Sequence, residues 1–320
     1  MKVMFVSNNP KYKYDEIQTG WNLLPSLFVK KRLKVLGIGK YELYKFYFKY
    51  LKFKPDLIVA EWVPAACIPI LFKKLGFVKC PVVLNWGDYY AEMMTCFPKK
   101  LVKMMEDFSV RNADYITTVS KFNEERAKKL GKVVFYIPHG FFGHKKKTKM
   151  NLDKLKTKKN NLKIVYLGEQ SKWKKVDKMI NAVEGLDCDL FLIGKPNSEF
   201  RKIAGKNVHF IGYVDRLEVW SLLKQADILV NPSNQDCNYK LFEYIAVGKP
   251  ILAYDGLPKY IFTHKKTAYL TKNFRAGLAE LMNNKRLRKR LEKNVKKIKT
   301  FTWEEIADKY IRLFKKLTKS

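Results

Sequence analysis

Residues 234–253 have the sequence NQDCNYKLFEYIAVGKPILA, and this stretch decides which fold the chain is expected to adopt. Its pattern predicts a polar loop, a short helix that begins near Asn238 and ends at Gly248, and a buried strand from Pro250. An apolar run over residues 227–231 predicts another strand directly before the loop. A strand, a polar turn and a helix N-terminus form a natural anion site, because the first backbone N–H groups of the helix lack partners.

Two charged side chains fall in the predicted helix. Lys240 lies in its first turn and Glu243 follows one helical turn later, so both side chains can face the same cleft. A cation for phosphate and a carboxylate for sugar hydroxyls suit a nucleotide diphosphate sugar. The alternative is that residues 241–246, LFEYIA, simply form a packed helix of an α/β domain.

The composition indicates a two-domain globular protein of unusual charge. The chain has 320 residues, 47% of them hydrophobic, which is long for a single core. Its 64 Lys and Arg against 30 Asp and Glu give a net charge of +34, which indicates either an anionic partner (nucleic acid, anionic lipid or phosphorylated substrate) or a lysine-rich solvated surface. No recognisable nucleic-acid module is present, so a nucleic-acid partner is not expected.

The sparse cysteines and histidines predict neither disulfides nor a metal site. Five cysteines and four histidines are scattered along the chain, and Asp187-Cys-Asp189 is interpreted as a strand edge rather than as a pair of metal ligands. The first ten residues are too polar for a signal peptide, and the longest apolar run, residues 62–72, is too short to cross a bilayer. We therefore expect a cytoplasmic protein without a transmembrane helix.

Apolar runs separated by helical patterns predict parallel βαβ units in both halves of the chain. The predicted strands are residues 3–7, 57–60, 82–85, 115–119 and 133–137 in the first half, and 162–167, 190–193, 208–211, 228–231 and 251–253 in the second. The polar, charged stretch 143–160 reads as an interdomain connector. Gly37-Ile-Gly39 has no obvious strand before it and no Gly-x-Gly-x-x-Gly occurs, so a dinucleotide dehydrogenase is unsupported.

Residues 238–250 fit the pattern Ser/Asn-x-Lys-Leu-x-Glu-Tyr-x-Ala-x-Gly-Lys-Pro, and by this stretch the chain resembles the family 4 retaining glycosyltransferases. Further segments resemble family elements in the expected order: residues 113–120, 137–140, 168–177, 210–214, 226–233 and 301–307. The resemblance implies the GT-B fold, in which two doubly wound Rossmann-like α/β domains face a central cleft. The implied domains are residues 1–145 on the acceptor side, with the helix 302–320 packing back on it, a basic connector 146–160, and the donor domain 161–301.

The resemblance also implies roles for individual residues. Glu243 would bind the ribose hydroxyls, Lys240 and Lys174 would neutralise the diphosphate, and the backbone near Tyr213 and Val214 would hold the base. The implied donor site consists of Thr19, Gly20, Gly168, Glu169, Lys174, Gly194, Tyr213, Val214, Gln235, Asp236, Asn238, Tyr239, Lys240, Leu241 and Glu243. Asp88, Lys174, Lys240 and Glu243 are the implied catalytic residues. Neither a metal nor a cofactor is expected.

Several positions depart from the family pattern. Gln235 stands where the first donor-site acid is expected, with Asp236 next to it, and Glu169 replaces an Arg, where its charge would repel a diphosphate if it pointed inward. Lys175 replaces a Gly, and Thr19-Gly20 replaces a Gly-Gly loop. On the acceptor side the usual His has no clear counterpart; Asp88 is the first candidate for its role and Glu61 the second, although either could be a turn or capping residue.

Residues 40–54 predict an amphipathic helix with an unusual outer face. Tyr44, Tyr47, Phe48 and Leu51 form one helical stripe that we expect to pack on the sheet. Lys45, Lys49 and Lys52 form a second stripe, and Phe46, Tyr50 and Phe53 a third that would point outward. Aromatic residues beside lysines suit the headgroup zone of an anionic membrane. The alternative is that another helix, around residues 21–34, covers the outer face.

The leading prediction is a retaining, metal-independent glycosyltransferase of hexosyltransferase type. It would move a sugar from a nucleotide diphosphate sugar to a glycan or lipid-linked acceptor, at the cytoplasmic face of the membrane. The alternative is a catalytically degenerate GT-B protein that binds nucleotide sugar or a partner without turnover, as the substitutions at Gln235 and Glu169 would allow.

Overall fold

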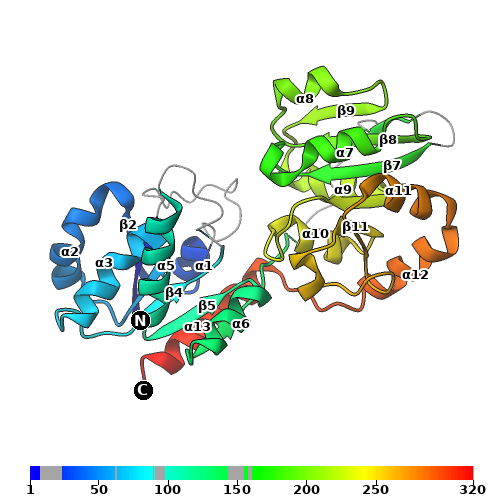
Figure 1. The fold of residues 1–320 in the computed structure, drawn as a ribbon. Helices are drawn as coiled ribbons and strands as arrows, with labels where there is room; N and C mark the ends of the chain where they lie inside the picture. Colours follow the sequence, from blue (N-terminus) through cyan, green and yellow to red (C-terminus); the bar gives the residue numbers. More distant parts are fainter. Residues whose placement is uncertain are drawn as a thin grey trace. The chain divides into compact units, whose positions relative to one another are not determined.

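A computed structural model describes residues 1–7, 24–61, 63–88, 90, 98–142, 155–157 and 161–319. The chain divides into two compact units, Met1–Gly140 with Phe301–Ser320, and Phe141–Thr300 (Figure 1). Thr19, Gly20 and most of the predicted connector 146–160 lie outside the described residues. No helix in the described parts of the chain is both long and apolar enough to cross a membrane.

The first unit is a parallel six-stranded sheet in the order β2-β1-β3-β4-β5-β6. Its strands are β1 (Lys2–Ser7), β2 (Lys34–Gly39), β3 (Leu57–Glu61), β4 (Val82–Asn85), β5 (Tyr115–Thr118) and β6 (Val134–Tyr136). Its helices are α1 (Leu24–Lys30), the 3-10 helix η2 (Lys40–Lys45), α2 (Phe46–Phe53), α3 (Val63–Lys74), α5 (Lys99–Asn112), α6 (Lys121–Lys129) and α13 (Trp303–Leu317). The inner strands β1, β3 and β4 are mostly buried and form apolar runs, as parallel strands covered on both faces do.

The C-terminal helix belongs to the first unit. Phe28 of α1 lies against Phe5 of the sheet and Phe314 of α13, with ring centroids 5.7 Å apart in both pairs. A capping box of Thr302 and Glu305 starts α13, with each side chain accepting a hydrogen bond from the other residue's backbone N–H. Through the rings of Phe5, Phe28 and Phe314, the last helix of the chain is connected to its first strand.

Two predictions in this unit are wrong. The segment before η2 is itself a strand, because β2 pairs with β1 along its whole length up to Gly39. The stripes of residues 40–54 are also interchanged. Phe46 is 1% exposed, and Tyr50 and Phe53 pack partly buried against the core, whereas Tyr44 and Phe48 are 75% and 76% exposed.

Residues 40–54 form the 3-10 helix η2 followed by α2, and packing against α3 decides which face of α2 is buried. Phe46 packs edge-on against Phe72 of α3 at 5.6 Å, and the Tyr50 hydroxyl accepts a hydrogen bond from the backbone N–H of Lys79 at 3.0 Å. Phe46, Tyr50 and Phe53 are therefore core residues and cannot form the predicted membrane-docking stripe. Of its lysines, Lys45 and Lys52 are exposed and Lys49 pairs with Glu42 at 2.8 Å.

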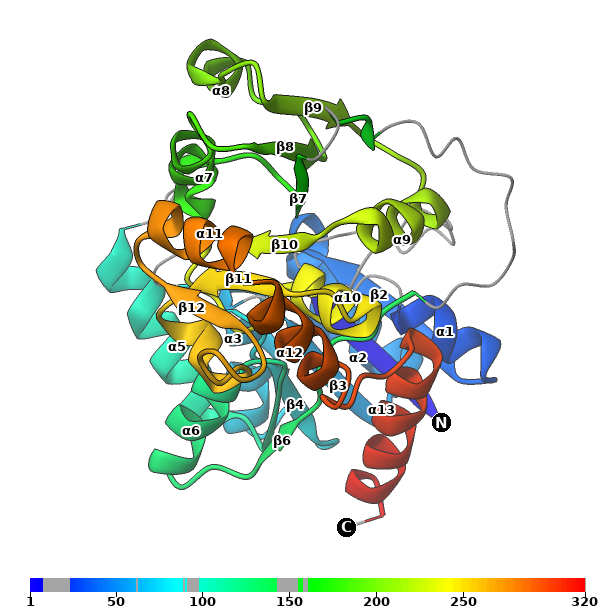
Figure 2. The ribbon, with the colours of Figure 1, turned by 90° about the vertical axis from the view of Figure 1, so that its right-hand side faces the viewer.

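The second unit is another parallel six-stranded sheet, in the order β12-β11-β10-β7-β8-β9 (Figure 2). Its strands are β7 (Leu162–Leu167), β8 (Cys188–Ile193), β9 (Val208–Gly212), β10 (Ile228–Asn231), β11 (Ile251–Tyr254) and β12 (Tyr269–Thr271). Its helices are η4 (Lys172–Lys174), α7 (Val176–Ala182), α8 (Ser198–Ile203), α9 (Arg216–Gln225), α10 (Tyr239–Val247), η5 (Leu257–Tyr260), α11 (Phe274–Asn283) and α12 (Lys285–Val295).

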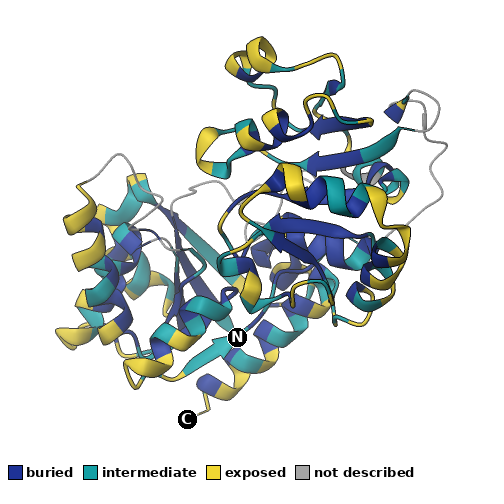
Figure 3. Ribbon diagram, turned by 45° about the vertical axis from the view of Figure 1, so that its right-hand side comes forward, coloured by how far each residue is buried: buried dark blue, intermediate teal, exposed yellow. Residues whose placement is uncertain are grey.

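Helices cover both faces of this sheet. Residues of α7, α11 and α12 share one buried cluster with the strands, and residues of α9 and α10 share the other. Figure 3 shows the buried strands between more exposed helices. The predicted class, two doubly wound α/β units, is confirmed. The chain order runs from β7 to one edge of the sheet and then returns to β10, so β7 and β10 flank the topological switch point, where such sheets bind ligands.

The Asp187-Cys-Asp189 stretch is a strand edge, as predicted. Asp189 is buried at the start of β8, where its carboxylate accepts a hydrogen bond from the Asn161 amide at 2.9 Å and lies 2.8 Å from His209 Nε2. Among the described residues, no group of three or more His, Cys, Asp or Glu side chains is arranged to hold a metal ion.

Candidate functional site

A tyrosine hydroxyl holds the switch point of the second unit open. The strands β7 and β10 are paired only over two positions, Ile164 with Ile228 and Val165 with Leu229. Beyond them, the Tyr244 hydroxyl accepts a hydrogen bond from the backbone N–H of Leu167 at 2.9 Å. It donates one to the Val230 carbonyl at 3.3 Å. Burial raises the pKa of Tyr244 well above its ordinary value, so this hydroxyl stays protonated and joins α10 to both strands.

Two glycines bring the loops after β7 and β8 together. Gly168 and Gly194 have φ angles of +127° and +132°, which side-chain-bearing residues rarely adopt. The Gly168 N–H donates to the Ile193 carbonyl at 2.8 Å, and a Cβ on Gly194 would collide with the Gly168 carbonyl. A Cβ on Gly168 would lie 3.8 Å from Lys240 Nζ, so this backbone passes directly beside the lysine.

The helix N-terminus next to these loops is not capped by its own side chain. Asn238, the N-cap of α10, makes no side-chain bond to the helix backbone. Its amide donates instead to Ser233 Oγ at 2.7 Å, and Ser233 donates to Asn231 Oδ1 at 2.9 Å. The Asn238 side chain therefore stabilises the preceding loop. It does not cap the backbone N–H groups at the positive end of the α10 dipole.

Lys240 is a buried cation in the first turn of α10. Its side chain is 7% exposed, and its ammonium lies 3.9 Å from the centre of the Tyr166 ring. Within the part of the chain that the structure describes, Nζ has no hydrogen-bond partner. Burial and then the neighbouring charge of Lys174 lower its pKa well below 10.5, while Glu169 opposes the shift. A buried lysine without a hydrogen-bonding partner is unfavourable in a folded protein unless a ligand completes it.

Further unpaired polar atoms lie in the loop after β7. Gln170 is buried; its Oε1 accepts from the backbone N–H of Asn197 at 3.2 Å, whereas its Nε2 has no partner among the described residues. The same is true of Ser171 Oγ. Gln170, Ser171 and Lys240 thus place unused polar groups on the two segments that flank the switch point.

The charge of Glu169, which would repel a diphosphate if it pointed inward, is held in an ion pair within its own loop. Its carboxylate pairs with Lys174 Nζ at 3.5 Å, and its backbone carbonyl accepts a hydrogen bond from the Tyr166 hydroxyl at 2.7 Å. The Glu169 side chain is more than half exposed and that of Lys174 is mostly buried. Lys174 is therefore paired with a carboxylate of its own loop.

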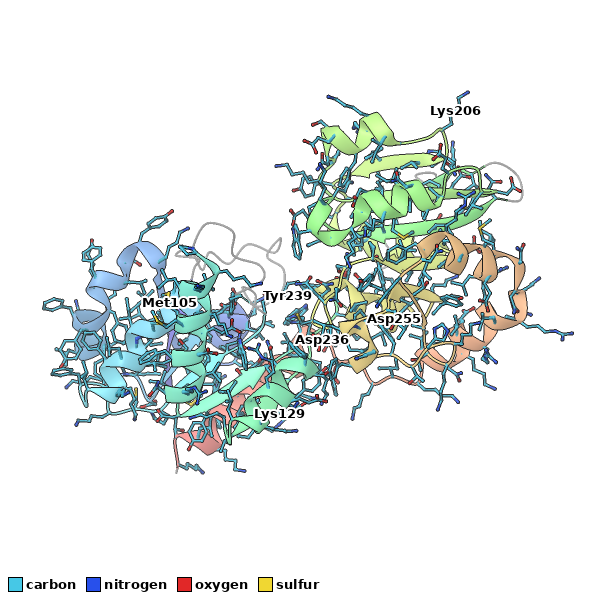
Figure 4. All side chains as sticks on the ribbon, in the orientation of Figure 1. Met105, Lys129, Lys206, Asp236, Tyr239 and Asp255 are labelled. Carbon is cyan, nitrogen blue, oxygen red and sulfur yellow. The ribbon has the colours of Figure 1, made fainter. Side chains whose placement is uncertain are left out.

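The other predicted donor residues occupy the same edge of this sheet. Asp236, Leu241 and Glu243 are buried in or before α10, Gln235 is half-buried, and Tyr239 is partly exposed; Figure 4 labels Asp236 and Tyr239 at the start of that helix. Tyr213 and Val214 follow β9, the edge strand two positions from β7. The Tyr213 side chain is 79% exposed.

In the first unit, the two acceptor-side candidates lie near each other. Glu61 ends β3 opposite Asn85 of β4, and Asp88 follows β4 three residues later. Burial, and next the charge of Asp88, raise the pKa of Glu61 to about 8. Asp88 is half-buried, and its backbone carbonyl accepts from the Asn123 amide at 3.4 Å. Near neutral pH the Glu61 carboxyl is therefore mostly protonated.

The sequence interpretation missed Tyr166, Gln170 and Tyr244 as parts of the site. Tyr244 belongs to the quoted pattern but received no role, because its two partners lie on strands distant in sequence. Tyr166 reads as an ordinary residue of a buried strand, and no pattern distinguishes Gln170 from a loop residue.

Comparisons with known proteins agree with this geometry. Residues 148–298 match the family model described as Glycosyl transferases group 1. The chain is 25% identical over 352 residues to the uncharacterized glycosyltransferase MJ1069 of Methanocaldococcus jannaschii, which covers 98% of this chain and 89% of that protein.

Two solved structures share the fold. HepE of Anabaena in complex with UDP has a TM-score of 0.78 at 16% identity, covering 99% of this chain and 100% of its own. Sucrose-phosphate synthase of Thermosynechococcus elongatus has a TM-score of 0.78 at 16% identity, covering 99% and 98%. The protein therefore has the GT-B fold, is a homologue of a glycosyltransferase, and carries a Glycosyl transferases group 1 domain in its second half.

Proposed function

We propose that the protein is a retaining glycosyltransferase of hexosyltransferase type that uses a nucleotide diphosphate sugar as donor. The observation that carries this proposal is the buried Lys240 ammonium at the switch point, which has no hydrogen-bond partner among the described residues. A diphosphate placed there would meet Lys240, Lys174 and the N-terminus of α10. The protein's own cations would then stabilise the leaving diphosphate, and no metal is required by the proposal.

The remaining donor-site roles follow the position of each residue. Glu243 lies one turn after Lys240 on α10 and would accept hydrogen bonds from the ribose hydroxyls. The backbone at Tyr213 and Val214 would contact the base, and Gly168 would let the phosphates approach the loop closely. The complexes of HepE with UDP and with UDP-glucose support uridine nucleotides as the first donors to test.

On the acceptor side, the proposal places the acceptor hydroxyl near Asp88 and Glu61. The raised pKa of Glu61, about 8, leaves a protonated carboxyl beside a second carboxyl group. Such a pair can donate one hydrogen bond and accept another, which suits the recognition of sugar hydroxyls. The acceptor would be a glycan or a lipid-linked molecule, reached at the cytoplasmic face of a membrane.

Calorimetry tests the donor site. UDP, GDP, ADP and their sugar conjugates are titrated into the wild type, Lys240→Met and Lys206→Met. Lys206 is an exposed lysine of the second unit, distant from Asp236 and Tyr239 in Figure 4, and serves as the matched control. We expect one nucleotide to bind the wild type and the control equally and Lys240→Met much more weakly. Equal binding by all three proteins would refute the placement of the diphosphate.

A second candidate function is a GT-B protein that binds nucleotide sugar without turnover. The ion pair between Glu169 and Lys174 favours it, because an acid occupies the cation that a diphosphate would need. Release of nucleotide from the donor, including slow hydrolysis, separates the two functions. Saturable binding without any release over a day would support the second.

A further inference from the structure

The first unit carries an exposed apolar surface on the outer side of η2, α2 and the end of α3. It consists of Tyr41, Tyr44, Phe48 and Leu51, together with Leu75 and Phe77, and is called the aromatic face below. Tyr47 of α2 connects this helix to the second part, since its ring lies 5.8 Å from that of Phe77. Of these side chains, Tyr44, Tyr47, Phe48 and Leu51 form the stripe that the sequence pattern had assigned to the core.

Lysines surround the aromatic face. Residues 40–54 contain five lysines and one glutamate, and the glutamate is already paired with Lys49. The ammonium of Lys40 lies 4.9 Å from the centre of the Tyr41 ring, and that of Lys45 lies 5.1 Å from the Tyr44 ring. Cations beside exposed aromatic rings are typical of protein segments that rest in the headgroup zone of a bilayer.

A hollow of about 440 Å³ opens beside this face, lined by Tyr50, Leu51, Lys54, Pro55, Lys79 and Cys80. Lys54 and Lys79 are the exposed cations at this hollow, and Leu51 and Pro55 form an apolar part of its lining. Lys54 also ends α2 in the left-handed conformation, with φ +49°, where glycine is favoured. A hollow with two lysines and an apolar side matches a phosphate group attached to an acyl chain.

We propose that the aromatic face docks on a bilayer that contains anionic phospholipids, with one lipid phosphate held between Lys54 and Lys79. A second copy of the chain would bring the same positive charge to the contact and is disfavoured. Nucleic acid would match the charge, but it offers no hydrocarbon for Leu51, Leu75 and Phe48. An anionic bilayer satisfies both the lysines and the apolar side chains.

The proposed function places the acceptor at the cytoplasmic face of a membrane. The docking surface rests on that statement alone and adds the residues and the lipid that would make the contact. Lipid binding at α2 involves none of the residues of the second unit, so a failure of nucleotide binding would leave it intact. Conversely, a wild-type protein that binds nucleotide but does not bind anionic vesicles would refute the docking surface and leave the donor site standing.

The experiment is cosedimentation of the full chain with vesicles of phosphatidylcholine, or of phosphatidylcholine and phosphatidylglycerol at about three to one. We expect strong binding to the anionic vesicles only, with a linear loss of log affinity as salt rises. The double variant Tyr44→Ser with Phe48→Ser removes two exposed rings and should lower the partition coefficient at least ten-fold. Its matched control, Val133→Ser with Ile203→Ser, removes two exposed apolar side chains elsewhere and should bind like the wild type.

A charge variant tests the phosphate position without risk to the fold. Lys54→Gly relieves the left-handed backbone while it removes one ammonium, so we expect unchanged or higher thermal stability and about five-fold weaker vesicle binding. Lys265→Gly is the matched control, because Lys265 also has a positive φ, of +54°, and lies in the second unit. Lys54→Gly that binds as tightly as Lys265→Gly would refute the phosphate position.

The same variants decide between partners. If the Tyr44 and Phe48 double variant binds anionic vesicles like the wild type, the docking surface is refuted. If it loses affinity for a 20-base-pair DNA duplex but not for vesicles, the face is a nucleic-acid surface and the proposal is wrong. If it abolishes a concentration-dependent dimer seen by sedimentation velocity, with vesicle binding unchanged, the occupant is a second copy and the proposal is equally overturned.

Discussion

Replacing Lys240 by methionine should change stability and donor binding in opposite directions. The lysine is buried beside Lys174, and its ammonium has no hydrogen-bond partner among the described residues. Methionine has nearly the same length and no charge, so it removes the desolvation cost while it keeps the packing against Tyr166. Replacing buried ionic groups by well-packed apolar residues is often neutral or stabilising by about 1–4 kcal/mol, and we expect Lys240→Met to stabilise the protein within that range.

The gain should depend on pH in a defined direction. Burial, followed by Lys174, lowers the pKa of Lys240 well below 10.5, so between that lowered value and 10.5 the unfolded chain binds more protons than the folded one. The free energy of unfolding of the wild type must therefore rise with pH across this window and reach its full value above 10.5. Lys240→Met lacks this contribution, so its advantage over the wild type should shrink as the pH is raised.

Nucleotide binding should show the opposite effect. Charge-assisted hydrogen bonds to phosphate contribute about 1.5–3 kcal/mol, so the variant should bind a nucleoside diphosphate about 10–150-fold more weakly. A bound diphosphate favours the charged lysine, so wild-type affinity should fall as pH rises through the lowered pKa of Lys240, and the variant should lack that slope.

Urea unfolding and titration calorimetry at several pH values measure both effects, with Lys206→Met as the control. A Lys240→Met protein that is less stable than the wild type at pH 7, and that binds nucleotide equally well, would refute the reasoning at both steps.

Three further predictions concern single side chains. Glu169→Gln frees Lys174 from its partner, so calorimetry should show affinity for a nucleoside diphosphate rising up to about five-fold, as expected for a largely exposed ion pair; weaker binding would contradict this competition. Tyr244→Phe removes the hydroxyl that bridges β7 and β10 and should cost about 1–3 kcal/mol in urea unfolding; no loss would show that water replaces the bridge. Because burial and Asp88 raise the pKa of Glu61 to about 8, the wild type should lose stability as pH rises from 4.5 to about 8. The size of that loss follows from about 1.4 kcal/mol per pKa unit, and Glu61→Gln should not show it. Parallel plots of unfolding free energy against pH for the two proteins would refute the raised pKa.

Most strands were predictable because parallel strands buried on both faces are continuous apolar runs. Residues 82–85, 162–167 and 228–231 are strands with the predicted bounds. The edge strand β2 escaped notice because a lysine begins it and two glycines end it, which breaks the apolar run. Its position is fixed by pairing with β1, a contact that no local pattern contains.

Residues 40–54 show why a helical face can be assigned wrongly. Aromatic residues occupy two opposite stripes of this segment, so its composition does not say which stripe is buried. The choice is made by tertiary packing, in which Phe46 lies against Phe72 of α3.

The candidate donor site was predictable where a single element contains it. The positions of Lys240 and Glu243 on one helix follow from their spacing alone. The side chains that complete the site come from other strands, and the ion pair of Glu169 with Lys174 depends on the path of the loop after β7. Such contacts join residues through the fold and leave no periodic trace in the sequence.

The Tyr244 bridge also links the order in which the second unit folds to the appearance of its site. The amide proton of Leu167 belongs to β7, yet its acceptor is a side chain 77 residues further along the chain. That proton should exchange with deuterium only when α10 leaves the sheet, so its exchange rate reports the lifetime of the assembled site. An intermediate with β7 formed and α10 detached would have neither the bridge nor Lys240 in place, so the assembled site and the bridge appear together.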